Sequence, residues 1–126
     1  MNDTATGRAI LDELRPLHRE MRRAVPEVYR GFGALHGAAL GAGALDVKTK
    51  ELIALAIAVT ERCDGCIASH AEASARAGAT RDEAAEAIGV AVLMRGGPAT
   101  IYGPRAFEMF CEFMAERPHL TTEIAS

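Results

Sequence analysis

The sequence contains no apolar segment long enough to cross a membrane. Its longest uninterrupted apolar run, from Leu52 to Val59, falls well short of the ~20 residues that a transmembrane helix needs. The N-terminal sequence MNDTATGRAILDEL is polar and lacks the apolar core of a secretory leader. From these two absences we expect no membrane contact and a cytoplasmic location.

A surplus of positive charge is also absent. The 14 lysines and arginines are outnumbered by 17 aspartates and glutamates, and the arginines are scattered among the acids. The basic run from Arg19 to Arg23 is best explained as a solvated face of a helix. We therefore expect no nucleic acid among the partners of this protein.

Cysteine is scarce and odd in number. Three cysteines in a chain without a secretory leader indicate a reducing compartment. There, a pair spaced as Cys63 and Cys66 more often serves catalysis or metal binding than structural cross-linking. Cys111, which lies between Phe110 and Phe113, is expected to be a core or interface cysteine.

Strand-like alternation is missing as well, and nearly the whole chain shows helical periodicity. The length suits a single domain over residues 1–126, and we expect an all-α fold of about six helices. The expected helices span residues 6–23, 26 to the Gly41–Gly43 region, 47–62, 64–77, 81–95 and 101–118. The tail after Leu120 is expected to fray.

Local signals set several of these boundaries. Pro26 and Asp46 are suited to the starts of the second and third helices, and Gly78 to the end of the fourth. Thr80 followed by Glu83 predicts a capping box at the start of the fifth helix.

The middle of the fifth helix has no polar side chain from Ala87 to Met94. A helix that is apolar on every side is expected to be buried all round, either at the centre of the domain or across a subunit contact. Because the chain is short, we expect subunit contacts to cover part of it.

The strongest functional signal is a set of four residues in fixed register: Glu51, Cys63, Cys66 and His70. Cys66 and His70 are four positions apart, so on a helix they lie on one face about a turn from each other. Cysteine reacts as the thiolate, which is a minor form near neutral pH, so His70 is a candidate base. A carboxylate such as Glu51 fixes the tautomer of a neighbouring imidazole and raises its basicity. Together they predict a thiol redox site with a proton relay.

The surroundings of Cys63 favour an anion. Cys63 is expected near the N-terminus of the helix that begins at Asp64 or Gly65, where the helix dipole stabilises a thiolate. Arg62 adds a neighbouring positive charge.

Other interpretations stay open. Cys63 and Cys66 could form an inert buried pair. With His70 and Glu51 they could instead bind zinc, although structural zinc sites usually draw on two separated cysteine pairs. Glu51 could also be a solvated residue of its helix.

The remaining candidates are weaker. His18, His36 and His119 have no partner pattern, and each is expected to be exposed to solvent. Tyr102 is expected to pack in the core or at an interface, with a place in a pocket near the thiols as the alternative.

The segment from Leu45 to Tyr102, including KELIALAIAVTERCDGCIASHAEASARAGAT, resembles the carboxymuconolactone decarboxylase superfamily in its alkylhydroperoxidase D-like branch. The four-residue set and the Gly96–Pro98 break carry the resemblance over this core motif region, residues 45–102. It implies an all-helical bundle that assembles as a homo-oligomer, a trimer or a hexamer. It also implies thiol-dependent reduction of peroxides, and we expect neither a cofactor nor a metal ion.

Carried over residue by residue, the resemblance makes Cys66 the cysteine that attacks a hydroperoxide and Cys63 the partner that closes the disulfide. Glu51 and His70 match the proton relay. Attack would leave a sulfenic acid on Cys66, which condenses with Cys63. An external dithiol donor, lipoyl-like or thioredoxin-like, would then restore the pair. Helix-start electrostatics alone would favour Cys63 as the more acidic thiol, but His70 lies in reach of Cys66.

One position departs from the peroxidase branch, which carries a second histidine between the cysteines where this chain has Gly65. The departure removes one possible proton carrier. Two other functions therefore stay open. One is a cofactor-free lactone decarboxylase, which needs acid and base groups but no thiol pair. The other is a non-catalytic, redox-sensing oligomer.

Overall fold

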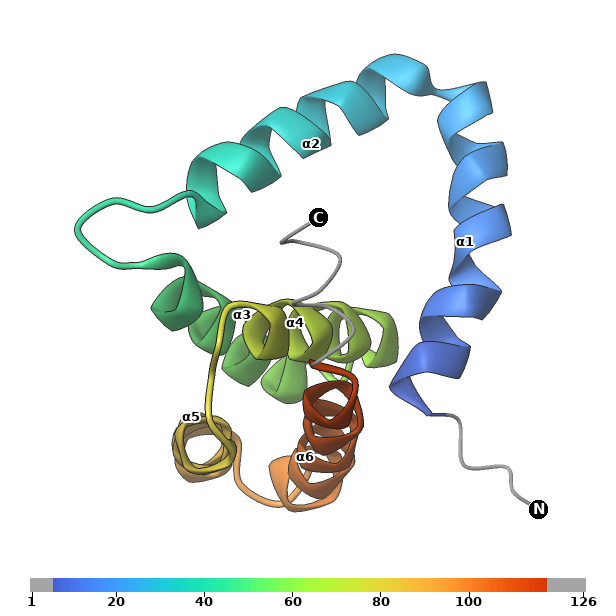
Figure 1. Cartoon of the computed structure of the whole chain (residues 1–126). Helices are drawn as coiled ribbons and strands as arrows, with labels where there is room; N and C mark the ends of the chain where they lie inside the picture. The colour runs from blue at the N-terminus through green and yellow to red at the C-terminus, as the bar shows by residue number, and fades with distance from the viewer. Residues whose placement is uncertain (1–5, 118–126) are drawn as a thin grey trace.

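The structure is a computed structural model that describes residues 6–117. Figure 1 shows helices joined by short connections, and the described residues contain no strand. The six helices are α1 (Gly7–Ala24), α2 (Pro26–Leu40), α3 (Val47–Glu61), α4 (Asp64–Arg76), α5 (Arg81–Arg95) and α6 (Ala99–Ala115). The all-α prediction is confirmed, while the tail after Leu120 lies outside the described residues.

The predicted capping residues account for the helix boundaries. The Asp46 carboxylate accepts the backbone N–H of Thr49 at 2.8 Å at the start of α3. At the start of α5, Thr80 and Glu83 exchange the two hydrogen bonds of a capping box, at 2.9 and 3.1 Å. The backbone N–H of Thr80 and, next, the ammonium group of Lys48 hold the pKa of Glu83 below its usual value. The same Lys48 contact, at 2.9 Å, ties α3 to α5.

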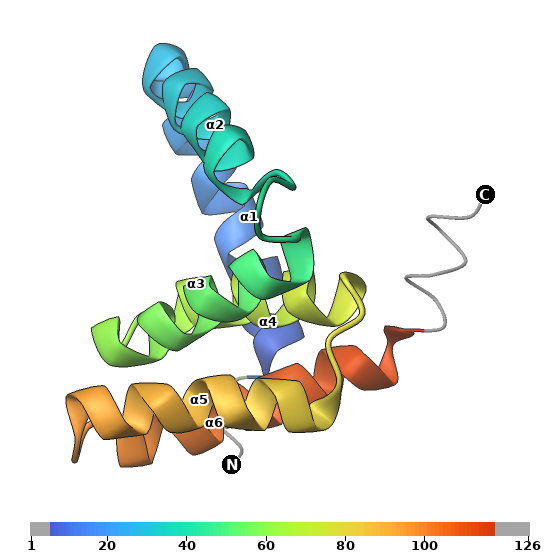
Figure 2. The ribbon, with the colours of Figure 1, turned by 90° about the vertical axis from the view of Figure 1, so that its left-hand side faces the viewer.

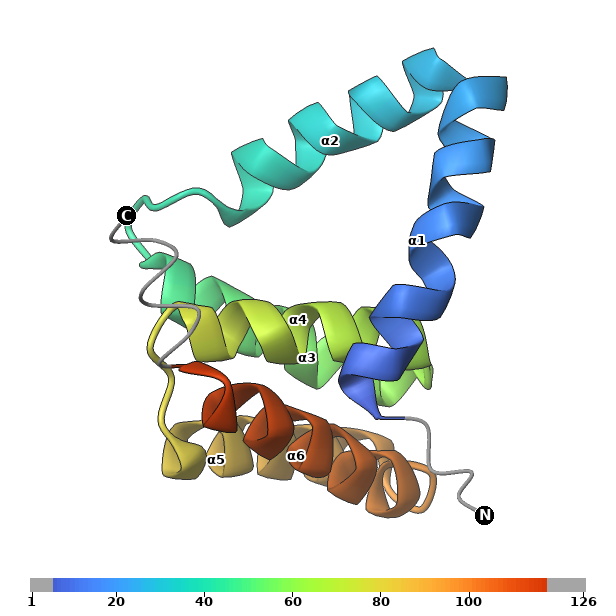
Figure 3. The same ribbon diagram turned by 45° about the vertical axis from the view of Figure 1, so that its right-hand side comes forward.

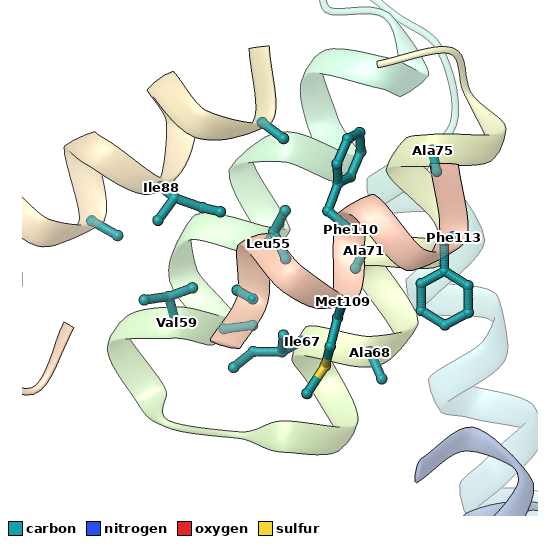
Figure 4. Packing of buried hydrophobic residues seen from close by; sticks show 14 of the residues in the cluster. Leu55, Val59, Ile67, Ala68, Ala71, Ala75, Ile88, Met109, Phe110 and Phe113 are labelled. Atoms are coloured by element: carbon teal, nitrogen blue, oxygen red, sulfur yellow. The ribbon is translucent and has the colours of Figure 1, made fainter. Parts of the chain in front are cut away.

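Helices α3 to α6 form the core of the fold in two layers. Figure 2 shows α3 and α4 lying over α5 and α6, and each layer packs against the other. Leu55 of α3, Ile67 of α4, and Phe110 and Phe113 of α6 are fully buried between them (Figure 4). Alanines on the inner face of α4 let the neighbouring helices approach closely. This packing holds α3 and α4, the two helices that carry the predicted site residues, against α5 and α6.

Helices α1 and α2 form an arm that stands away from this core (Figure 3). The start of α1 is docked by charge: the Arg8 guanidinium contacts Glu72 of α4 at 2.7 Å and Glu116 of α6 at 2.8 Å. The backbone N–H of Gly7 also donates to the Glu112 carboxylate at 2.8 Å. The arm therefore leaves the core from a fixed point.

The far end of the arm is tied back to α3. The ammonium group of Lys50 donates to the backbone carbonyl of Gly41, just after α2, at 2.6 Å. Because both ends of the arm are held, the inner side of α2 keeps a defined position over α3 and α4.

The Gly7 contact gives a prediction about stability. A Cβ at position 7 would come within 2.5 Å of Cε2 of the buried Phe113 ring, so Gly7→Ala has to displace a core side chain. We expect a loss of about 1–3 kcal/mol in the free energy of unfolding, measured by urea titration. Gly31→Ala in α2 is the matched control because its Cβ meets nothing within 4 Å, and it should be neutral or slightly stabilising. Equal effects of the two substitutions would contradict this packing.

Burial of residues 87–94 at the centre of the domain, one of the two expected alternatives, is wrong, and cover by a subunit contact stays a prediction. Ala84, Ile88 and Ala91 of α5 face the core, whereas Leu93 is 79% and Met94 76% exposed. Helix α5 lies in the outer layer and has α3 and α6 on one side only. The other half of its apolar surface is therefore left without a neighbour from the described residues 6–117.

Large apolar side chains are exposed on two surfaces. The first surface lies on α3 and α5 and is formed by Ile53, Ile57, Val90, Leu93 and Met94. Part of it lines a hollow of about 530 Å³ between the two helices, here named the α3/α5 groove. The second surface lies on the arm and is formed by Leu17, Met21, Val28, Phe32 and Leu35. None of the helices in residues 6–117 is both long and apolar enough to span a bilayer.

Candidate active site

The connection between α3 and α4 places the two cysteines. Helix α3 ends at Glu61, and its C-cap Arg62 has a left-handed backbone (φ 56°) that turns the chain out of the helix. Cys63 follows in an extended conformation and is the N-cap of α4. Cys63 therefore lies at the N-terminus of a helix, as predicted, and Cys66 lies in its first turn.

The two cysteines form a disulfide. Their Cα atoms are 5.2 Å apart, within the usual range for such a bond. The backbone N–H of Cys66 also donates to Sγ of Cys63 at 3.3 Å. Cys66 is exposed and Cys63 is half-buried, so the pair is not buried. Cys66 is the more exposed residue of the two.

Glu51 and His70 form the second part of the site. His70 lies one turn after Cys66 on α4, and its Nδ1 is 2.7 Å from Oε1 of Glu51 on α3. The side chains are 7% and 19% exposed for Glu51 and His70. Glu51 is thus not a solvated residue of its helix. Because the carboxylate occupies Nδ1, Nε2 is the ring nitrogen not engaged by Glu51.

Helix α6 holds the start of α4 in place. Asp64, next to Cys63, accepts from the Arg105 guanidinium at 2.9 Å. The same guanidinium lies 5.6 Å from the centre of the Tyr102 ring, which packs against the core. Tyr102 therefore has the packing role that we expected, and it also supports the arginine that reaches the cysteine helix.

Gly65 lies where α1 comes close to the cysteines. A Cβ at position 65 would be 2.9 Å from Cδ1 of Leu14. The space that a histidine between the cysteines would need is therefore partly taken by the arm, and such a side chain would have to displace Leu14.

Sequence reasoning missed the place of His36. The prediction that it is exposed is confirmed, but its ring also stacks on His70, with 6.3 Å between ring centres and 14° between the planes. Nothing in the local pattern of α2 indicates this contact, because it depends on how the arm returns to the core. His18 is exposed, and its Nδ1 lies 3.3 Å from the Tyr29 hydroxyl. His119 lies outside the described residues.

Two other predictions can be compared with the structure. Cys111 is free, half-buried and packed against the core, as expected of a core cysteine. Within residues 6–117, no three His, Cys, Asp or Glu side chains are arranged to hold a metal ion, so the geometry gives the zinc interpretation no support.

These observations define an all-helical protein with a paired-cysteine site beside a buried carboxylate and a histidine. The family model described as "Carboxymuconolactone decarboxylase family" matches residues 26–109, which include the whole site. The chain therefore belongs to the carboxymuconolactone decarboxylase family.

Similar sequences come from several bacteria. A protein of Cupriavidus necator is 34% identical over 100 residues, which cover 79% of this chain and 88% of that protein. A protein from the cox locus of Paracoccus denitrificans is 39% identical over 93 residues, which cover 74% of this chain and 84% of that protein.

Solved structures agree in fold. A carboxymuconolactone decarboxylase family protein from Legionella pneumophila has a TM-score of 0.83 and 42% identity, with 86% of this chain and 96% of that chain covered. A member of the same family from Thermotoga maritima, whose description suggests an antioxidative response, has a TM-score of 0.70 and 29% identity. The comparison covers 93% of this chain and 96% of that one.

Proposed function

We propose that the protein is a thiol-dependent reductase of the alkylhydroperoxidase D-like type, which reduces hydroperoxides or disulfides and is regenerated by an external dithiol. The observation that carries this proposal is the Cys63–Cys66 disulfide at the start of α4, one turn from the His70–Glu51 pair. An antioxidative description of a family member from Thermotoga maritima supports it. A reducing cytoplasm, which maintains dithiol donors, is the setting that suits this chemistry.

The reaction starts from the reduced pair. The Cys66 thiol passes its proton to Nε2 of His70, and the thiolate attacks the peroxide oxygen. An S–O bond forms, the O–O bond breaks, and the alkoxide leaves with a proton as the alcohol. Cys63 then attacks the sulfenic sulfur of Cys66, which releases water and forms the disulfide. An external dithiol reduces the disulfide by thiol–disulfide exchange and is itself oxidised.

The assignment of Cys66 as the attacking sulfur rests on its exposure and its register with His70. Cys66 is exposed and four positions before the histidine, whereas Cys63 is half-buried. The helix N-terminus favours an anion at Cys63, which instead suits the partner that must attack the sulfenic acid as a thiolate.

The first experiment is a thiol titration of the reduced protein before and after one equivalent of cumene hydroperoxide, with intact mass read alongside. We expect the rapid loss of two thiols and of about 2 Da, reversed by dithiothreitol. Unchanged thiols would contradict the proposal and favour a decarboxylase, which needs no thiol pair. A disulfide that no dithiol reverses would indicate a redox-sensing role.

The relay gives a separate prediction. In the proposed relay Glu51 orients His70, and His70 is the base that takes the proton of the Cys66 thiol. Glu51→Gln and His70→Ala should each move the midpoint of the iodoacetamide alkylation rate of Cys66 to a higher pH. Glu61→Gln, at the exposed end of the same helix, is the control and should leave the profile in place. If both relay variants match the wild-type profile, the relay is wrong even where the peroxidase activity is present.

We also propose that the functional form is a homo-oligomer. The α3/α5 groove and the apolar surface of the arm are both exposed, and the arm projects away from the groove in the same chain. Exposed apolar surfaces of this extent are typical of protein contacts. A second copy supplies both surfaces at once, so it is the occupant that we favour for the groove. A trimer or a hexamer is the assembly expected from the family resemblance.

A further inference from the structure

His36 faces the candidate active site from outside the four-residue set. It lies on α2, and its ring is stacked on His70 with an interplanar angle of 14°. The Nδ1 atom of His70 is engaged by Glu51 at 2.7 Å, and the His36 ring lies nearly parallel to the His70 ring with 6.3 Å between their centres. Lys50, which binds the carbonyl of Gly41, holds the end of α2 near this position.

Reduction of the cysteine pair moves two protons, because the dithiol donor releases two protons as its sulfurs become thiolates and the two cysteines take up two. A donor thiolate attacks one sulfur, the S–S bond breaks, and the leaving thiolate takes up a proton. The second donor sulfur then attacks the mixed disulfide, and the second cysteine thiolate takes up another proton. His70 supplies one carrier on α4, and Gly65 supplies none. Leu14 already lies against the place where a side chain at position 65 would begin.

His36 is the more exposed of the two histidines. The His70 side chain is 19% exposed, whereas His36 is exposed and lines a hollow of about 560 Å³ on the arm. Tyr29, Arg22 and Arg30 line the same hollow, and Arg30 is paired with Glu27. With 6.3 Å between the ring centres, proton transfer between the two histidines requires a bridging water molecule.

We propose that His36 is a positioning residue that acts through His70 as the second proton carrier of the Cys63–Cys66 pair. It exchanges protons between His70 and solvent while the pair is reduced and reoxidised. The inference rests on the proposed thiol redox function, and it assigns to α2 a role that the four-residue set alone does not contain.

The test follows reduction of the disulfide by dithiothreitol, with acid-quenched samples alkylated and weighed. His36→Ala and His36→Phe should each slow reduction about tenfold, below the effect of a group that meets the reacting atoms directly. Imidazole added to the buffer should restore His36→Ala, because the open hollow admits it, but not His36→Phe, whose ring fills the space. His18→Ala is the control, since His18 is an exposed histidine of the same arm whose ring lies beside Tyr29 rather than beside His70.

Each outcome of this experiment either supports or overturns the proposed role of His36. If His36→Phe is as fast as the wild type, the ring serves packing only and the inference is overturned. The same holds if imidazole fails to restore His36→Ala while circular dichroism shows the wild-type helix content. If His36→Ala does not fold, His36→Phe alone carries the test. A wild-type disulfide that dithiothreitol cannot reduce would contradict the proposed function itself, whereas normal reduction in every variant contradicts only the role of His36.

Discussion

Replacing Cys66 with serine should reduce hydroperoxide consumption to the rate of dithiol and buffer alone. The substitution removes the exposed sulfur that lies one turn before His70, and a serine hydroxyl is far less ionised than a thiol. The measurement is the steady-state loss of cumene hydroperoxide with dithiothreitol as the donor. Because every turnover begins with the attack of Cys66 on the peroxide, no partial activity should remain.

Cys63→Ser distinguishes the roles of the two cysteines. Attack at Cys66 should still occur once, but the sulfenic acid has no partner and should be trapped as a dimedone adduct on Cys66. Cys111→Ser is the matched control, because Cys111 of α6 is free and packs against the hydrophobic core. This variant should keep full activity. Equal activity of the Cys66 and Cys63 variants would contradict this division of roles.

Placing a glutamate at Ile57 should break the proposed oligomer. Ile57 is 56% exposed in the protomer and lines the α3/α5 groove together with Val90 and Met94. A carboxylate buried there without a partner costs several kilocalories per mole. We therefore expect the dissociation constant of the oligomer to rise by about a hundredfold or more. Light scattering after size-exclusion chromatography measures the mass at micromolar concentration.

Two further variants make this result specific. Val28→Glu, on the exposed surface of the arm, should have the same effect if the arm of one copy covers the groove of another. Ala9→Glu adds the same charge at an exposed position of α1 and should leave the mass unchanged. A wild-type protein that is monomeric at these concentrations, or an Ile57→Glu variant with the wild-type mass, would contradict the proposal.

The fold could be predicted from the sequence because its signals are local. Asp46, the Thr80–Glu83 capping box and Gly78 mark helix ends with contacts that reach only a few residues along the chain. The burial of α5 could not be predicted in the same way. An apolar helix has the same sequence whether its second face is covered by its own chain or by another, and here its own chain covers only one side.

In the candidate site, too, some features follow from the sequence and others depend on the tertiary arrangement. The position of Cys63 at a helix start follows from the local pattern, whereas the pairing of Glu51 with His70 is expected from the chemistry of the side chains and from the family resemblance. The stacking of His36 on His70 and the approach of Leu14 to Gly65 depend on the path of the arm across the core. No periodicity in α1 or α2 encodes that path.

The first turn of α4 stays intact around the disulfide. The backbone N–H of Ile67 donates to the Cys63 carbonyl at 2.8 Å although the side chains of Cys63 and Cys66 are joined. The cysteines thus meet across a single helical turn, whose own hydrogen bonds already hold their Cα atoms at bonding distance. Oxidation and reduction can then proceed as a local exchange of sulfur partners on a rigid backbone, with little reorganisation of the fold between the two states.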